Sequence, residues 1–162
     1  MKKFDVRKLV IAALLASFVC VATMIIQIPN GLGGYLNLGD CIVLLCGWLL
    51  GPTYGALAAG IGSGLADVFA SYVVYAPATF VIKALMAVIS YFVARKRGRF
   101  CRILSGICAE AVMIIGYFVY EIYLYGVSGA LPGIFPNVLQ GIVGIVCAIF
   151  LKEFIDKKGL WN

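Results

Sequence analysis

The chain has 162 residues, of which 64% are hydrophobic and only 12% charged, with a mean hydropathy of +1.06. Soluble domains are about 45–50% apolar and about 25% charged, so this composition excludes an ordinary soluble protein. The net charge of +6 would suggest nucleic acid in a soluble chain, but in a membrane protein it reports cytoplasmic loops rich in Lys and Arg. We therefore expect one integral membrane domain over residues 1–162 and no nucleic-acid partner.

The apolar runs are long and continuous, which favours membrane-spanning helices over a barrel of alternating strands. At about 20–25 residues per span, the length allows about six helices. Basic residues form three clusters, at 2–8, 95–102 and 152–158, and an even number of crossings separates them if all are cytoplasmic. The sequence predicts an all-α bundle of six transmembrane helices with both termini cytoplasmic. The expected helices cover residues 9–28, 38–50, 53–70, 77–94, 103–124 and 133–151.

The first expected helix follows a basic stretch, so a signal peptide is an alternative interpretation of the N-terminus. Residues 9–28 are long enough to span a membrane, which favours a retained helix. Ala12 and Ala16 lie four residues apart on this helix, and small residues at that spacing let another helix approach closely. That helix belongs either to the same chain or to a partner subunit.

The expected topology places three segments outside the membrane, at residues 29–37, 71–76 and 125–132. Each carries Gly, Pro, Tyr or Asn, so turn-forming and polar residues gather on one face. We expect these segments to close over a shared pocket. At the start of the second helix, Asn37 and Asp40 either cap exposed N–H groups or contact a ligand.

Several ionisable residues interrupt the apolar spans, where they cost several kcal/mol and usually face an interior or a watery cavity. One interpretation is that Lys83 and Glu121, with Asn137 and Gln140 on one helix face, line a pocket for a polar solute. The alternative is that Lys83 pairs with a carboxylate and holds helices together. The remaining acidic residues in the spans are Asp40, Asp67 and Glu110.

Tyrosines near the expected outer face either stack on a ligand ring or form an interfacial belt. They are Tyr35, Tyr72, Tyr75 and Tyr117.

The chain has no His, no Walker A motif and no metal-ligand or nucleophile signature. We therefore expect neither an enzyme nor a metal or cofactor site.

The segment from Gly34 to Ile89 resembles the substrate-binding S components of energy-coupling factor (ECF) transporters. It is most similar to the branch linked to riboflavin, pyridoxine and hydroxymethylpyrimidine. The order and spacing of several motifs carry the resemblance, whereas the last two helices share only hydropathy and placement. The motifs are Asn37-Leu38-Gly39-Asp40, Leu50-Gly51-Pro52, Gly55, Gly60 to Gly64, Ala66-Asp67, Tyr75-Ala76-Pro77, Thr79 and Ile82-Lys83.

The resemblance implies a vitamin site that faces outward beneath the three outer segments, in the cell membrane of a prokaryote. It implies that Gly31, Gly33 and Gly34 let the first segment bend as a lid. It also implies that Ala12 and Ala16 dock onto a transmembrane coupling subunit, while two partner ATPases hydrolyse ATP. The substrate-binding candidates are Tyr35, Asn37, Asp40, Asp67, Tyr72, Tyr75, Thr79, Lys83, Tyr117, Glu121, Asn137 and Gln140.

The sequence therefore predicts a binding subunit of an ATP-driven importer, with a pyridoxine- or hydroxymethylpyrimidine-like ligand favoured and riboflavin as the second choice. One alternative is a secondary transporter driven by H⁺ or Na⁺, with Glu110 as its coupling group. Another is a structural membrane protein without a ligand, in which Lys83 and Glu121 can be replaced together without loss.

Overall fold

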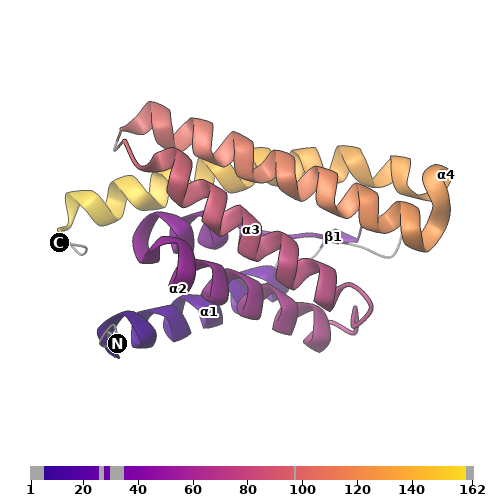
Figure 1. Cartoon of the computed structure of the whole chain (residues 1–162), viewed down its shortest axis with the longest axis horizontal. Helices are drawn as coiled ribbons and strands as arrows, with labels where there is room; N and C mark the ends of the chain where they lie inside the picture. The colour runs from indigo at the N-terminus through magenta and orange to yellow at the C-terminus, as the bar shows by residue number, and fades with distance from the viewer. Residues whose placement is uncertain (1–5, 26–27, 30–34, 97, 160–162) are drawn as a thin grey trace.

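The structure, a computed structural model, describes residues 6–25, 28–29, 35–96 and 98–159. Within these residues it contains four helices, all long and apolar enough to cross a membrane. The helices extend along the long axis of the molecule (Figure 1). They are α1 (Val6–Ile25), α2 (Gly39–Phe69), α3 (Ala76–Ala94) and α4 (Arg99–Lys157).

Two glycines break the long helices α2 and α4. Gly51 has φ 80° and ψ −173°, and Gly126 has φ 74° and ψ 173°, both outside the helical region. At each glycine the chain turns back on itself, and in Figure 1 the yellow second segment of α4 returns beside the orange first segment. In α2, a Cβ atom at Gly55 would lie 2.5 Å from the carbonyl oxygen of Cys46, so its two segments are also packed together. Within the described residues, α2 and α4 are thus each divided at a glycine into two packed segments.

The expected outer loop over 125–132 is wrong. Helix α4 continues through Pro132 and Pro136, and only Gly126 departs from helical geometry. Glycine reaches positive φ at little cost and so reverses the chain in one residue. The prolines are tolerated because neighbouring helices in a membrane bundle compensate for the freed backbone groups.

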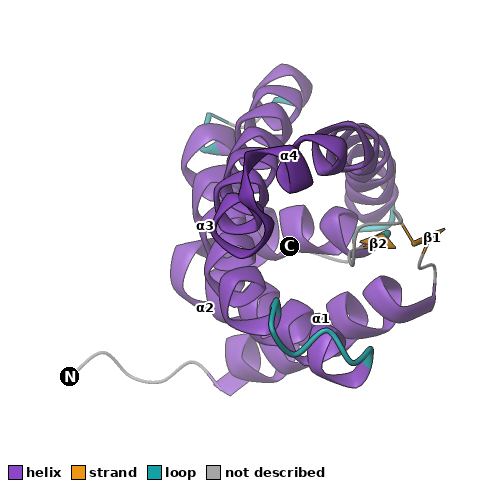
Figure 2. Cartoon of the chain, turned by 90° about the vertical axis from the view of Figure 1, so that its right-hand side faces the viewer, coloured by secondary structure: helices purple, strands orange, loops and turns teal. Residues whose placement is uncertain are grey.

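The expected loop over 29–37 contains a small antiparallel β-hairpin. Strand β1 (Ile28–Pro29) pairs with β2 (Tyr35–Leu36), with Ile28 opposite Leu36. The view along the helices places this hairpin to one side of the bundle, close to α4 (Figure 2), and β2 contacts α4. The expected lid glycines Gly31, Gly33 and Gly34 lie outside the described residues.

Connections gather at the two ends of the bundle. The α2–α3 connection and the reversal of α4 lie at the right-hand end in Figure 1. The start of α1, the end of α4 and the α3–α4 connection lie at the opposite end. This arrangement brings residues 71–76 and the reversal of α4 to one face, as the sequence predicted for two of its three outer segments.

Small residues allow the helices to pack closely. A Cβ atom at Gly62 in α2 would lie 2.4 Å from the carbonyl oxygen of Ala16 in α1. A Cβ atom at Gly47 would lie 2.3 Å from the carbonyl oxygen of Ala87 in α3. Ala12 is only 6% exposed, so α2 already covers much of the Ala12 side of α1.

We predict that Gly126→Ala lowers the free energy of unfolding by about 1–3 kcal/mol, because an L-residue at this φ and ψ is strained. Gly98→Ala is a matched control. Neither glycine has an atom within 4 Å of its Cβ position, but Gly98 has an extended φ of 179° that any residue adopts. Denaturant unfolding in detergent micelles measures both variants. Equal losses in the two would show that backbone strain at the reversal is not the cause.

Candidate functional site

The first segment of α2 begins deep inside the bundle. It runs from Gly39 to Leu50, about 18 Å at about 1.5 Å per residue, which is shorter than the bilayer core of about 30 Å. Asp40 in its first turn is fully buried. Non-helical backbone at membrane depth persists only where protein covers it or where it lines a cavity. The chain that leads into α2 therefore brings polar groups into the interior.

Four polar residues form one connected network at this helix start, which we call the Asp40 network: Asn37, Asp40, Lys83 and Gln140. Lys83 forms a buried ion pair with Asp40 Oδ1. Gln140 Nε2 donates to Asp40 Oδ2 at 2.6 Å. The Oε1 atom of Gln140 accepts from the backbone N–H of Asn37 at 3.0 Å and from its Nδ2 at 3.4 Å. The network ties α3 and the second segment of α4 to the start of α2.

The structure separates the roles expected for Asn37 and Asp40. Asn37 Oδ1 accepts from the backbone N–H of Gly39 at 2.8 Å, which supports the first turn of α2. Asp40 instead directs its oxygens towards Lys83 and Gln140. Asp40 therefore joins helices together, because Lys83 lies on α3 and Gln140 lies on α4.

An aromatic ring lies beside the Asp40 network. The Lys83 ammonium lies 5.5 Å from the centre of the Tyr117 ring, within range of a cation–π contact. The Tyr117 hydroxyl is 3.0 Å from Thr79 Oγ1. Thr79 and Lys83 are four residues apart on α3 and therefore share a helix face. This places a hydroxyl, an ammonium and a ring side by side.

Glu121 belongs to a different group of residues. It is 6% exposed and packs against Gly133, where a Cβ atom would lie 2.5 Å from Glu121 Oε2. Nearby, the rings of Tyr75 and Tyr120 meet edge to face at 5.7 Å, and the Tyr120 hydroxyl donates to the carbonyl of Val74 at 2.5 Å. Lys83 pairs with a carboxylate, Asp40, as the alternative interpretation expected, and the grouping of Lys83 with Glu121 around one pocket stays a prediction.

The other candidates are more scattered. Asp67 is buried near the end of α2 and interacts electrostatically with Tyr117. Tyr72 and Asn137 are half-buried. Tyr35 lies in β2, but its side chain is outside the described part of the chain.

Sequence reasoning left one buried carboxylate out of the candidate ligand contacts. Glu110 is 3% exposed, and neither of its oxygens has a hydrogen-bond partner among the described residues. Its position in an apolar run was a visible signal, but spacing alone did not show that it lies close to Asp40.

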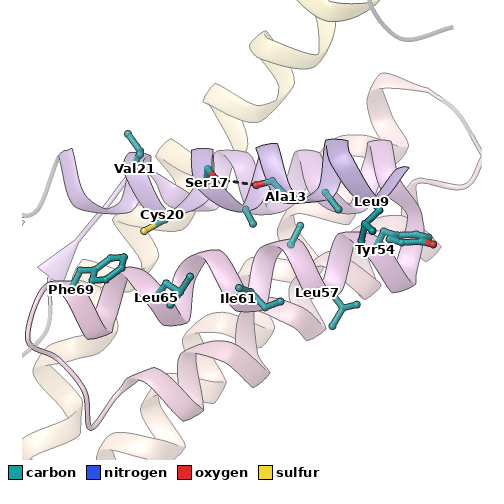
Figure 3. Close-up of a pocket in the computed structure, with 13 residues that line it drawn as sticks. Leu9, Ala13, Ser17, Cys20, Val21, Tyr54, Leu57, Ile61, Leu65 and Phe69 are labelled. Atoms are coloured by element: carbon teal, nitrogen blue, oxygen red, sulfur yellow. Dashed lines mark hydrogen bonds between the residues drawn. The ribbon is translucent and has the colours of Figure 1, made fainter. Parts of the chain in front are cut away.

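An apolar groove of about 500 Å³ runs along the outside of the bundle between α1 and the second segment of α2 (Figure 3). Ala12 and Ala16 line it, together with the exposed Ala13 and Ser17. The Ser17 hydroxyl donates to the carbonyl of Ala13 at 3.0 Å, so the proton of this hydroxyl is already used within α1. The small residues of α1 thus take part both in packing within the chain and in this open surface.

We predict that Lys83→Met lowers the free energy of unfolding by about 3–5 kcal/mol, because it leaves Asp40 charged and buried without its cation. The double variant Asp40→Asn/Lys83→Met should recover at least half of this loss, since Asn still accepts from Gln140. Arg99→Met is the control. It removes an exposed ion pair with Glu153 and should cost about 0–1 kcal/mol.

Denaturant unfolding in micelles gives the coupling between the two positions. A double variant as unstable as the sum of its single variants would contradict a direct Asp40–Lys83 interaction.

Comparison with known proteins shows what this arrangement is similar to. A Pyrococcus woesei protein of uncharacterised function is 38% identical over 142 residues, covering 86% of this chain and 95% of that protein. The thiamine precursor transporter HmpT of Lactococcus lactis subsp. cremoris is 27% identical over 160 residues, covering 98% of this chain and 93% of that protein. A solved structure of the S component of a bacterial ECF transporter superposes with a TM-score of 0.78 at 25% identity, covering 94% of this chain and 97% of that one.

The family comparison extends over nearly the whole chain. The model of the ECF-type riboflavin transporter S component matches residues 3–157, which include all four helices and the complete Asp40 network. This confirms the resemblance inferred from the segment between Gly34 and Ile89 and extends it to the last two expected helices. The chain belongs to the family of ECF-type riboflavin transporter S components, a family of membrane transport components and not of enzymes.

Proposed function

We propose that this chain is the membrane-embedded subunit that captures a small vitamin precursor for an ATP-driven ECF importer in a prokaryotic plasma membrane. The Asp40 network carries the proposal. Polar side chains from three helices and from the segment before α2 converge at one buried point. A protein keeps ionisable groups at this depth when they bind a solute or hold a framework around one.

The chemistry beside the network suits a small polar heterocycle. The Tyr117 ring offers an apolar face, while Thr79 and Lys83 offer a hydroxyl and an ammonium on the same side. Such a mixture of one stacking surface and a few directed polar groups is typical of small-molecule sites. A hydroxymethylpyrimidine-like or pyridoxine-like ligand fits it, and similarity to the thiamine precursor transporter HmpT favours the pyrimidine. Riboflavin is the second candidate, because the matching family model bears its name.

The proposed topology has six crossings with both termini in the cytoplasm. The reversals at Gly51 and Gly126 divide α2 and α4 into two segments each, which with α1 and α3 make six. The basic cluster around 95–102 lies at the same end as the start of α1 and the end of α4, so positive charge gathers at one end, as it does on cytoplasmic faces.

We propose that the groove between α1 and α2 receives the transmembrane coupling subunit, which in turn connects to two ATPase subunits. Ala16 lines the groove with its small side chain, and the exposed apolar residues Leu57, Ile61 and Leu65 form its other wall. Without a water-driven hydrophobic effect between helices in lipid, close approach of small residues is the main source of affinity. A bulky residue here would therefore block docking without reaching the Asp40 network.

We predict that Ala16→Trp abolishes ATP-dependent uptake of labelled hydroxymethylpyrimidine and leaves its binding within about twofold of the wild type. Uptake is measured in vesicles that contain the coupling subunit and ATPases, and binding is measured on the purified chain. Leu14→Trp is the matched control, since Leu14 is 55% exposed on α1 but lies outside the groove lining. It should transport normally.

Two results would contradict the proposal. Uptake by vesicles that lack the ATPases would favour the ion-coupled alternative. Absence of binding for hydroxymethylpyrimidine, pyridoxine and riboflavin alike would remove the binding role itself.

A further inference from the structure

Glu110 is a buried carboxylate that the proposed site does not use. It lies in the first segment of α4, is 3% exposed, and neither Oε1 nor Oε2 has a hydrogen-bond partner among the described residues. A buried polar group normally has partners, and leaving one without them costs about 1–3 kcal/mol, more for a charged group. A buried polar group without a partner needs an explanation, and a bound ligand that supplies the missing hydrogen bonds is one.

Glu110 is next to the Asp40 network. Its carboxylate packs against the second segment of α4, where Cβ atoms at Gly141 and Gly144 would lie 3.2 and 3.3 Å from its oxygens. The same Cβ position at Gly144 would lie 3.0 Å from Cβ of Asp40. Asp40 and Glu110 therefore flank one glycine, and both interact electrostatically with Lys83.

Among the described residues, no donor of the network bonds to Glu110, and the hydrogen bonds of the Lys83 ammonium and the Gln140 amide nitrogen go to Asp40. Asp40 uses one oxygen for Lys83 and the other for Gln140. Gln140 uses its amide oxygen for Asn37 and its amide nitrogen for Asp40. Both acceptor oxygens of Glu110 are thus unused. The Lys83 ammonium interacts electrostatically with two carboxyl groups, those of Asp40 and Glu110.

We propose that Glu110 is a specificity-determining ligand contact whose carboxyl oxygens accept hydrogen bonds from an N–H edge of the bound heterocycle, such as a ring amino group. The inference rests on the proposed function and names the chemistry that the same site selects.

The charge balance favours a donor over an acceptor. A ligand that presented a carboxylate or phosphate here would add negative charge beside two carboxyl groups, and a carbonyl would offer Glu110 no donor. An N–H donor satisfies Glu110, and its hydrogen bond to the ionised carboxylate would be about twice as strong as a neutral one. A metal ion is less suitable, because the described residues contain no group of three or more His, Cys, Asp or Glu that could hold one.

The test compares two ligands that differ at one group. Hydroxymethylpyrimidine carries a ring amino group, and its oxo analogue carries a carbonyl in that place. Calorimetric titration of the purified chain should show wild-type protein binding the amino ligand at least roughly tenfold more tightly, from the usual strength of a hydrogen bond to a charged group. In Glu110→Gln this preference should fall to near unity or reverse, because an amide also donates to a carbonyl.

Glu153→Gln is the control, since Glu153 lies at the far end of the same helix in an exposed ion pair with Arg99; it should keep the wild-type preference. Equal binding of both ligands by wild-type protein would overturn the inference, even if Glu110→Gln failed to fold. An equal loss of both ligands in Glu110→Gln would also overturn it, since that result marks a structural role. If wild-type protein bound neither ligand, nor pyridoxine or riboflavin, the proposed function would fail and the inference with it.

Discussion

The ion pair between Asp40 and Lys83 lies where charges are most expensive, at the centre of a helical bundle in lipid. Neither residue is more than 3% exposed. Breaking such a pair is costly because the remaining charge stays buried without solvation by water. The pair therefore constrains the start of α2 and the middle of α3 relative to one another, and Gln140 extends the constraint to α4. The buried start of α2 depends on these contacts.

Glycine makes this arrangement possible in two ways. At Gly51 and Gly126 it reverses the chain in a single residue, so α2 and α4 each supply two packed segments. At Gly39 and Gly144 it removes a side chain that would collide with Thr23 and Asp40 respectively. The bundle thus brings Glu110 from one segment of α4 and Gln140 from the other close to Asp40. What results is a compact polar centre within a shell of exposed apolar side chains suited to lipid.

Composition and the order of motifs predicted the membrane-spanning character and the family. They did not predict which charged residues pair. Hydropathy identified the membrane-spanning helices, and the Gly51-Pro52 break and the buried positions of Asp40 and Lys83 followed from local sequence. The partner of Lys83 did not follow, because helix ends known only to within several residues leave both Asp40 and Glu121 within reach. Residues 125–132 looked like a loop from their Gly and Pro content, whereas the helical packing of α4 around Gly126 depends on tertiary contacts. The proximity of Glu110 to Asp40 likewise appears only in three dimensions.

If the Asp40 network holds a small vitamin precursor, the purified chain should carry that molecule. The most direct test is mass spectrometry of small molecules released by denaturing the purified chain. We expect one nitrogen heterocycle of the vitamin-precursor class, present in near-stoichiometric amount and absent when the chain carries Tyr117→Leu, which removes the ring beside Lys83. A chain that releases nothing, and still releases nothing after exposure to a mixture of vitamins and their precursors, would contradict the account.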